Sequence, residues 1–333
     1  MHIAFCTDIN YLMPTGVAMI SICENNRDID ICFHIVVTIN QGVTLESFYE
    51  LREIALKYDK KVFLYQITEG VLPKENHKMI SHVTKTTYSR FYLSDLLPES
   101  VDKVLYLDCD IICQGSLLEC WNVSLSEYGC IIGGVEDFGC YAGYMREHLS
   151  LSIKDTYINA GVLLIDLKRW RAGGFAGKCI ICAYNNNYPF MDQDVINTIL
   201  RGKIYILPFT YNLQVDFYIH DERFWMISGD RMKEVRNAKI KPAILHFSTL
   251  KPWKNPESSY SRIWLDYYQK SPWANSNYSK ILIHDICYSP FFLKLKNLYW
   301  SEFSIVYKTL PVYIYMVKFM HKIKIIFRPQ GHT

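Results

Sequence analysis

Two aspartates one residue apart, Asp108 and Asp110, are the side chains of this sequence best suited to chemistry. They directly follow the apolar run VLYL, which predicts a buried strand that delivers both carboxylates to one turn. Carboxylates this close repel each other unless a cation lies between them, and Mg²⁺ or Mn²⁺ accepts such oxygen ligands. An ion held there could bridge a diphosphate and neutralise the charge on a departing nucleotide. Without further context, the pair could equally be a solvated turn.

His246 and Lys251 supply the groups that would complete such a site. His246 lies in the strand-like run AILHF at 243–247, and Lys251 follows it by five residues. A neutral imidazole can be a third ligand for Mn²⁺ beside carboxylates, and a lysine can reach phosphate oxygens as a point charge. A lone histidine after a strand is otherwise a structural residue, so this prediction depends on the two aspartates.

Two further motifs join polar side chains to small or acidic residues. Asn159 precedes Ala160 and Gly161, where the glycine would let a backbone or a ligand approach closely. The run MDQDVIN at 191–197 carries Asp192, Gln193 and Asp194 at the start of an expected helix. Acidic residues also suit the first turn of a helix, so this second motif predicts either a ligand site or a helix start.

Alternating strands and helices would have to position these residues. The expected strands are 2–7, 30–38, 61–67 and 101–108, and helices are expected to open at Pro14 and to cover 44–58 and 84–98. Continuously apolar strands separated by helices indicate an α/β fold with a mostly parallel sheet that is covered on both faces. Ligands of such a sheet lie beyond the carboxyl ends of its strands, where Asp8 follows the first strand and Asp108 the fourth. Neither a GxGxxG motif nor a P-loop follows the first strand, which argues against the usual dinucleotide and P-loop sites.

The composition of the chain limits which kinds of partner and which cellular compartment we expect. The chain has 333 residues, 50% of them hydrophobic, and its net charge of +3 does not indicate a nucleic-acid-binding protein. Its 11 cysteines are an odd number and predict reduced thiols, and the pair Cys179 and Cys182 has no second pair to complete a zinc site. No secretory signal precedes the first strand and no apolar stretch reaches about 20 residues, so we expect a cytoplasmic protein.

The chain changes character from about residue 254 onward. A helical stretch at 261–270 leads into a tail rich in Tyr, Phe and Lys, in which Glu302 is the only acid after Trp300. The basic residues of this tail are Lys308, Lys318, Lys322, Lys324 and Arg328. Anionic lipid attracts each basic residue by roughly 1 kcal/mol while rings bury in the interface, so the tail predicts association with an anionic membrane surface. The alternative is a helical hairpin packed on its own domain.

Taken in order, six segments of the chain resemble glycosyltransferase family 8, which includes bacterial lipopolysaccharide glucosyl- and galactosyltransferases. The segments are HIAFCTDINY, TTYSRFYLSDLLP, DKVLYLDCD, YINAGVLLIDLKRW, MDQDVIN and HFSTLKPW, within residues 1–255. The resemblance implies a GT-A nucleotide-sugar-binding fold, a UDP-sugar donor, a Mn²⁺ or Mg²⁺ ion and retention of anomeric configuration. It also implies a catalytic domain at 1–255 and a helical, basic and aromatic segment at 256–333 for membrane association or acceptor binding.

The resemblance assigns roles to the residues that match the motifs of the family. The metal ligands would be Asp108, Asp110 and His246, and the contacts to uridine and ribose would be Thr7, Asp8 and Asn10. The diphosphate would contact Lys251, and the donor sugar would contact Arg90, Asp108, Asp137, Asn159, Asp192 and Gln193. One departure is that the loop of the family commonly has a glycine and one residue more between the histidine and the lysine, where Phe247 to Leu250 stand here. A backbone contact to phosphate is therefore expected to be shifted or lost.

These roles imply transfer of glucose or galactose from UDP to a lipopolysaccharide core or a related lipid-linked glycan, at the inner face of the cytoplasmic membrane and with an α-bond. The expected catalytic residues are Gln193, Asp192 and Asp137. Gln193 is a neutral amide and a poor nucleophile, which favours a front-face route in which it positions the sugar, with Asp192 as the alternative, covalent nucleophile. Three other functions fit parts of the sequence: a sugar nucleotidyltransferase, a self-glucosylating primer protein of the same fold, and a non-catalytic sugar-binding module.

Overall fold

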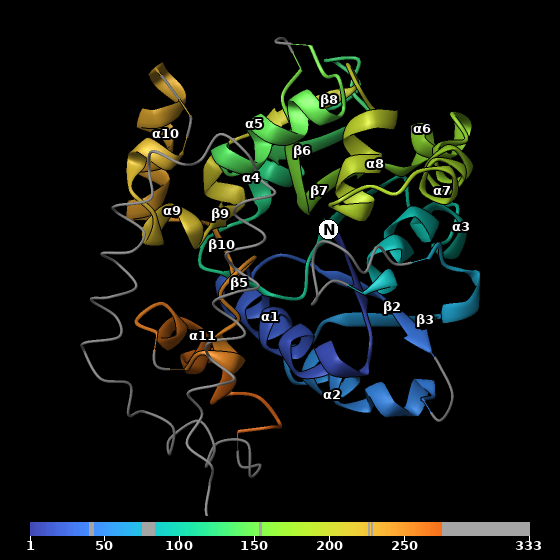
Figure 1. The fold of residues 1–333 in the computed structure, drawn as a ribbon. Helices are drawn as coiled ribbons and strands as arrows, with labels where there is room; N and C mark the ends of the chain where they lie inside the picture. The colour runs from blue at the N-terminus through green and yellow to red at the C-terminus, as the bar shows by residue number, and fades with distance from the viewer. Residues whose placement is uncertain are drawn as a thin grey trace, which may run out of the picture. The chain divides into compact units, whose positions relative to one another are not determined.

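The computed structural model describes residues 1–39, 43–74, 84–152, 155–225, 227, 229–256 and 258–274 (Figure 1). The expected basic tail after Trp300 lies outside the described residues, so its association with a membrane stays a prediction. The division of the chain at residue 255 likewise stays a prediction. Within the described ranges, no helix is long and apolar enough to cross a bilayer.

A seven-stranded sheet forms the centre of the described chain. From one edge to the other, its strands are β3 (Lys61–Thr68), β2 (Cys32–Ile39), β1 (His2–Thr7), β4 (Lys103–Leu107), β7 (Ile158–Asp166), β6 (Ile132–Glu136) and β8 (Ile204–Leu207). All of them run in one direction except β7, which pairs antiparallel with β4 and with β6. The predicted α/β fold with a mostly parallel sheet is therefore confirmed.

The reversal of β7 brings its amino end to the edge where the other strands have their carboxyl ends. Asn159, the second residue of β7, therefore lies at the same edge as Asp108, which follows β4. A backbone hydrogen bond of 2.8 Å from the Asp108 N–H to the Gly161 carbonyl joins the two strands there. Asp137, which follows β6, reaches this edge as well. Residues from three strands thus converge at the edge where an α/β sheet binds ligands.

A second, three-stranded sheet carries the predicted histidine to this edge. Its strands follow the order β5 (Ile111–Cys113), β10 (Ile244–His246) and β9 (Leu213–Gln214). In the register of these strands, His246 lies opposite Ile111 on one side and opposite Gln214 on the other. Because β5 begins directly after Asp110, the antiparallel pairing with β10 places the histidine beside the second aspartate.

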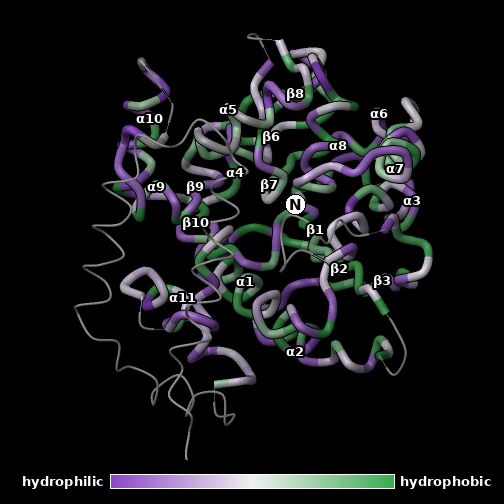
Figure 2. Tube along the Cα trace, viewed as in Figure 1, coloured by the Kyte–Doolittle hydropathy of each residue, from purple (hydrophilic) through white to green (hydrophobic). Residues whose placement is uncertain are grey.

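Helices cover both faces of the main sheet because its strands are apolar on both sides. Ile3 and Phe5 of β1 lie in a core shared with α1 (Leu12–Asn25) and α2 (Tyr49–Lys57). Ala4 and Cys6 lie in a second core shared with α7 (Phe175–Asn185) and α8 (Met191–Ile199). Figure 2 shows hydrophobic colour in α1 and a mostly hydrophilic α10 at the periphery. The remaining α-helices of the described residues are α3 (Leu93–Leu96), α4 (Leu118–Trp121), α5 (Gly139–His148), α6 (Leu167–Ala172), α9 (Asp216–Ile219), α10 (Gly229–Ile240) and α11 (Ser261–Tyr268).

Two expected helices are less regular than the sequence predicts. The segment 44–58 starts with the 3₁₀ helix Leu45–Phe48 before α2 begins. The prediction of a helix over 84–98 is wrong for most of its length, because a 3₁₀ helix covers Lys85–Tyr92 and only the short α3 follows. A 3₁₀ helix has three residues per turn, which puts Thr87 and Arg90 on one face. The Arg90 guanidinium donates a hydrogen bond to the Thr87 hydroxyl at 3.0 Å, a side-chain contact that the α-helical pattern of the sequence does not predict.

Helix α11 packs closely on the described chain. Its Trp264 is fully buried in a cluster that also includes Val17 of α1 and Trp253. The ring centroids of Trp253 and Trp264 are 5.6 Å apart, and those of Trp264 and Tyr268 are 5.3 Å apart. Residues beyond 255 therefore contribute to the core beside α1.

This packing predicts that Trp264→Ala destabilises the protein strongly. Removing a fully buried indole leaves a cavity, and we expect the free energy of unfolding to fall by about 3–5 kcal/mol in urea melts followed by far-UV circular dichroism. The matched control is Arg262→Ala on the exposed side of the same helix, which should change stability by less than about 0.5 kcal/mol. Equal stabilities of the two variants would show that α11 does not stabilise this fold.

Candidate active site

The structure brings Asp108, Asp110 and His246 together. One ligand atom from each of the three lies within 4.8 Å of the others. His246 Nε2 is 3.2 Å from Asp110 Oδ1 and 3.9 Å from Asp108 Oδ2. Asp110 and His246 are buried, whereas the Asp108 side chain is 26% exposed. Two carboxylates and one imidazole are a mixed oxygen and nitrogen donor set, which suits Mn²⁺ or a similar divalent ion.

The tautomer of His246 leaves one nitrogen available to a metal. Its Nδ1 lies 2.8 Å from Asn212 Oδ1, to which it donates its proton, so Nε2 keeps its lone pair toward Asp110. Asn212 is held in this orientation because its amide donates to Asn159 Oδ1 at 2.9 Å. Gly161 leaves room for the ring, since a Cβ at this position would lie 2.3 Å from His246 Cε1. The close approach expected at the glycine of this motif is thus made by the histidine itself.

Lys251 lies against the same group, on the far side of Asp110. Its ammonium donates to Asp110 Oδ2 and to the carbonyls of Phe247 and Ser248, both at 2.8 Å. Although burial opposes ionisation, the Lys251 ammonium holds the pKa of Asp110 well below its usual range. This buried ion pair keeps the Asp110 carboxylate ionised, which is the form that can bind a metal.

The loop between His246 and Lys251 is fixed by a residue that the sequence analysis did not single out. The hydroxyls of Ser248 and Thr249 both donate to the carboxylate of Asp216 at 3.0 Å. The carbonyls of Phe247 and Ser248 meanwhile bind Lys251. In place of the glycine typical of the family, this loop therefore has side chains that anchor it to α9.

Arg90 connects the two acidic motifs. Its guanidinium lies 3.0 Å from Asp108 Oδ1 and 2.9 Å from Asp192 Oδ2, and it donates to the Ala160 carbonyl at 2.6 Å. The guanidinium also lies over the ring of Tyr106, 4.4 Å from its centroid. Burial by itself would lower the pKa of Arg90, but Asp192, Tyr106 and Asp108 outweigh it and raise that pKa. This buried cation thus joins the residues after β4 to the start of α8.

A hydrogen-bonded polar cluster lies next to the metal group. Gln193 Nε2 donates to Asp137 Oδ2 at 2.8 Å and to the Tyr157 hydroxyl at 2.9 Å, while its Oε1 accepts from Ala160 N and Asn159 Nδ2. Asp137 is buried and accepts further bonds from the Phe138 N–H and from Gln214 Nε2. Burial raises the pKa of Asp137 in spite of these donors. The predicted residues Asp137, Asn159 and Gln193 are therefore in contact with one another.

The two acids of the third motif have different partners. Asp192 is bound by Arg90 and by the Thr87 hydroxyl, and burial nevertheless raises its pKa to about 6. Asp194 is fully buried and accepts from the Tyr157 hydroxyl at 2.6 Å and the Phe190 N–H at 2.8 Å. Burial raises the pKa of Asp194 to about 7. Asp192 thus contacts Arg90 of the site directly, whereas Asp194 acts through its hydrogen bond to Tyr157, which in turn binds Gln193.

The residues expected to contact the nucleotide lie at the end of β1 and directly after it. Asp8 accepts from the Asn10 N–H at 2.9 Å and from the hydroxyls of Thr84 and Thr86, so its carboxylate joins β1 to the 3₁₀ helix. Asn10 is exposed and open to a ligand. The Thr7 side chain is buried, donates to the Asp8 carbonyl at 3.2 Å and bonds to the Thr15 hydroxyl at 2.9 Å, and its contact with the nucleotide stays a prediction.

One pattern in the sequence could have revealed residues that were missed. In the run NLQVDF, polar Asn212, Gln214 and Asp216 alternate with apolar residues, which is the signature of one polar strand face. All three polar side chains bond to residues of the site or its loop. Tyr106 is likewise two residues before Asp108 and donates to its Oδ1 at 2.7 Å. Tyr157 carries no such signal, because its role depends on its contact with α8.

The sequence profile of glycosyltransferase family 8 matches residues 2–257, and the chain belongs to this family. The lipopolysaccharide 1,2-glucosyltransferase of Escherichia coli is 27% identical over 290 residues, which cover 83% of this chain and 80% of that protein. The lipopolysaccharide 1,3-galactosyltransferase of Salmonella typhimurium is 25% identical over 291 residues, covering 82% and 79%. The solved structure of the galactosyltransferase LgtC in complex with donor and acceptor sugar analogues has a TM-score of 0.71 and 21% identity, covering 84% of this chain and 99% of that chain.

These findings confirm the predicted family, the GT-A fold and the enzyme class, a retaining glycosyltransferase. They do not favour the nucleotidyltransferase, the primer protein or the non-catalytic module. The predicted roles of individual residues stay predictions.

The close approach at Gly161 predicts that Gly161→Ala damages the metal group without unfolding the protein. The added methyl would force the His246 ring away from Asp110, and we expect sugar transfer to fall roughly 100-fold, as for a displacement of about 1 Å at an active site. The measurement is the initial rate of UDP release at saturating donor and metal. Gly177→Ala is the control, because no atom lies within 4 Å of a Cβ at this position in α7. Equal rates for both alanine variants would contradict the role given to Gly161.

Proposed function

We propose that this chain transfers glucose or galactose from a UDP-sugar to a lipopolysaccharide core or a related lipid-linked glycan, forming an α-bond. The observation that carries the proposal is the contact between two groups of residues. Arg90 binds Asp108 of the metal group and Asp192 next to the polar cluster. A diphosphate on one side and a sugar on the other would match this arrangement, and the relatives named above transfer these two hexoses to lipopolysaccharide by their names.

The proposed site for UDP extends from the end of β1 to Lys251. Asp8 offers carboxylate oxygens to ribose hydroxyls, and the exposed amide of Asn10 offers bonds to the base. Lys251 would move from Asp110 to the diphosphate as the nucleotide binds, because phosphate oxygens compete for its ammonium. A divalent ion held by Asp108, Asp110 and His246 would supply charge neutralisation for the departing UDP.

The hydrogen bonds of Gln193 support the front-face route. Both lone pairs of its Oε1 already accept bonds, from Ala160 N at 3.0 Å and from Asn159 Nδ2 at 3.1 Å. This oxygen is therefore a poor nucleophile, and its role would be to position the sugar. In the proposed step the bond from the anomeric carbon to UDP breaks with its electron pair on the UDP oxygen. The acceptor hydroxyl attacks the same face, and its proton passes to the diphosphate.

The cellular location follows from the acceptor and the sequence. A lipid-linked acceptor would place the enzyme at the inner face of the cytoplasmic membrane, and the five basic residues expected after Trp300 would favour an anionic surface. These residues lie outside the described part of the chain, so the support for this step is the sequence alone.

A transfer assay tests the proposed function. We expect the purified chain with Mn²⁺ to move hexose from UDP-glucose or UDP-galactose to a truncated lipopolysaccharide core, releasing UDP in equal amount. Proton NMR of the new linkage should show an α-anomer. A β-linked product, a release of pyrophosphate, or hexose found only on the protein by mass spectrometry would each overturn the proposal.

Substitutions of Gln193 and Asp192 distinguish the two retaining routes. If Gln193 positions the sugar, Gln193→Ala should retain measurable turnover with a loss of roughly 10–1000-fold. Asp192→Ala should lose activity through the freed charge of Arg90, and added azide should not restore it. The controls are Gln269→Ala and Asp230→Ala, both at exposed positions. Formation of a glycosyl azide by Asp192→Ala would show that Asp192 is a covalent nucleophile and would contradict the front-face route.

A further inference from the structure

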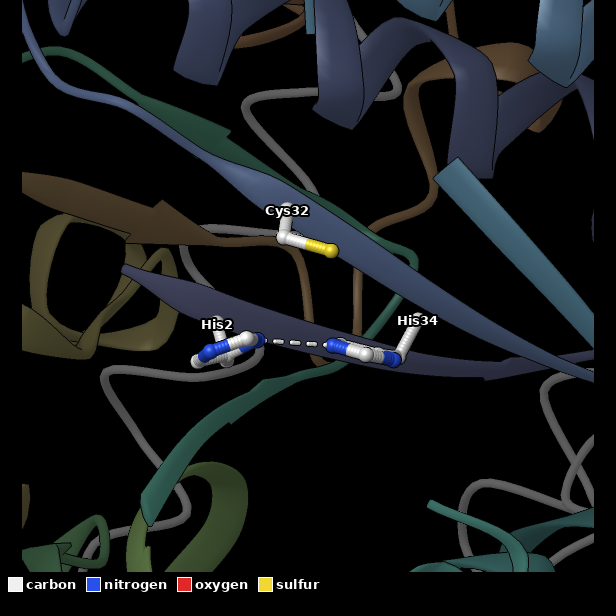
Figure 3. A group of neighbouring side chains, drawn as sticks. All are labelled: His2, Cys32 and His34. Atoms are coloured by element: carbon white, nitrogen blue, oxygen red, sulfur yellow. Dashed lines mark hydrogen bonds between the residues drawn. The ribbon is translucent and has the colours of Figure 1, made fainter. Parts of the chain in front are cut away.

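Three side chains that bind transition metals in other proteins meet at the amino ends of β1 and β2. His2 of β1 lies opposite Cys32 of β2 in the strand register, and His34 is two residues further along β2. Residues at i and i+2 of a strand share a face, and neighbouring strands are only about 4.8 Å apart. One ligand atom from each of His2, Cys32 and His34 accordingly lies within 4.8 Å of the others. Figure 3 shows the two rings edge to edge, joined by the hydrogen bond between them, with the Cys32 side chain above them.

The hydrogen bonds of the two histidines leave nitrogens that a metal can use. His2 Nδ1 lies 2.9 Å from His34 Nε2, and the other nitrogen of His34 lies 3.0 Å from the Tyr65 hydroxyl. Burial lowers the pKa of His34 to about 4 and also lowers that of His2, so both rings are neutral near pH 7. When His34 Nδ1 donates its proton to Tyr65, Nε2 keeps its lone pair toward His2. Metal-binding histidines are commonly oriented in this way by an oxygen on the far nitrogen.

We propose that His2, Cys32 and His34 form a second metal site that takes Zn²⁺ or a similar ion with a preference for nitrogen and sulfur ligands. Two imidazoles and one thiolate are a typical donor set for such ions, whereas the oxygen-rich group at Asp108 suits Mn²⁺ or Mg²⁺. A tetrahedral ion with bonds of about 2.0–2.1 Å separates two nitrogens by about 3.3 Å. The two nitrogens are 2.9 Å apart, so the rings would separate by a few tenths of an ångström and turn until both lone pairs point at the ion.

The position of this site separates it from the proposed catalysis. His2 is the first residue of β1, and Asp8, a residue of the proposed UDP site, follows the other end of this strand. At about 3.3 Å per residue, the backbones of His2 and Asp8 are therefore about 20 Å apart. His2 and Cys32 are half-buried, which gives an ion access from solvent. The amino group of Met1 donates to the Asp30 carbonyl at 2.7 Å. The proposed ligands are therefore the three side chains alone. An ion here would join β1 to β2 beside the N-terminus and stabilise the sheet.

The ligands of this site must lose protons when a metal binds. Burial raises the pKa of Cys32, so its thiol is protonated near pH 7 in the metal-free protein. Binding would form one sulfur–metal bond and two nitrogen–metal bonds and would break the hydrogen bond between the rings. The proton on His2 Nδ1 would move to Nε2 of the same ring, and the thiol proton would be released to solvent. One water is the natural fourth ligand of a tetrahedral ion with three protein ligands.

Cobalt titration tests the proposal on the full, untagged, metal-free chain. Co²⁺ occupies Zn²⁺ sites, and a bound thiolate gives a sulfur-to-cobalt charge-transfer band that ligands without sulfur cannot produce. We expect one equivalent of Co²⁺ to produce this band and one equivalent of Zn²⁺ to remove it. Cys32→Ser and His2→Asn should each abolish the band, while Cys182→Ser, a half-buried thiol in α7, should retain it.

Two further variants separate this site from the proposed active site and test the role of Tyr65. Asp110→Asn should retain the full band, because it changes only the oxygen-rich group. Tyr65→Phe should weaken Co²⁺ binding by roughly 10–100-fold, since it removes the group that orients His34. A wild-type protein without the band, or a band that persists in Cys32→Ser, would overturn the proposal and leave the three residues as a hydrogen-bonded pair beside a thiol. Because the readout is optical, it is independent of glycosyl transfer.

Discussion

The mutual repulsion of carboxylates at one edge of the sheet is the constraint that organises this enzyme. Asp110 and Asp192 are buried there and Asp108 is partly exposed, and each carboxylate has a positive partner. Arg90 serves Asp108 and Asp192, and Lys251 serves Asp110. Removing one partner of such a buried pair leaves an uncompensated charge and typically costs about 3–5 kcal/mol. The geometry of the site is therefore coupled to the stability of the fold.

The balance of charge also explains how a nucleotide and an ion could bind together. In the proposed complex with UDP, Lys251 is shared between Asp110 and the diphosphate, so a phosphate that binds the lysine leaves Asp110 with an unpaired charge. A divalent ion would satisfy that charge at the moment it arises. Arg90 has no such alternative, because Asp108, Asp192 and the Ala160 carbonyl hold it from three sides. Lys251 can thus move to the diphosphate, whereas Arg90 stays with its present partners.

Much of this arrangement could be predicted from the sequence. The apolar strands predicted the sheet, and the turn after VLYL placed Asp108 and Asp110 at its carboxyl edge. The reversal of β7 was not predictable from periodicity, because a buried strand is apolar in either direction. The 3₁₀ helix at Lys85–Tyr92 was missed because its form depends on bonds between Thr87, Arg90 and distant acids. Lys251 was expected at the diphosphate, and only tertiary packing shows its bond to Asp110.

The roles given to Asp110 and Lys251 are tested most directly by calorimetry of UDP binding with and without Mn²⁺. We expect Mn²⁺ to strengthen UDP binding to the wild-type chain by roughly tenfold or more, the scale of effects seen when a metal site is disturbed. In Asp110→Asn this strengthening should disappear, while UDP alone should bind at least as well, because Lys251 is then free for the diphosphate. Equal affinities with and without Mn²⁺ in the wild-type chain, or an unchanged effect of Mn²⁺ in Asp110→Asn, would contradict the claim that these residues hold the ion.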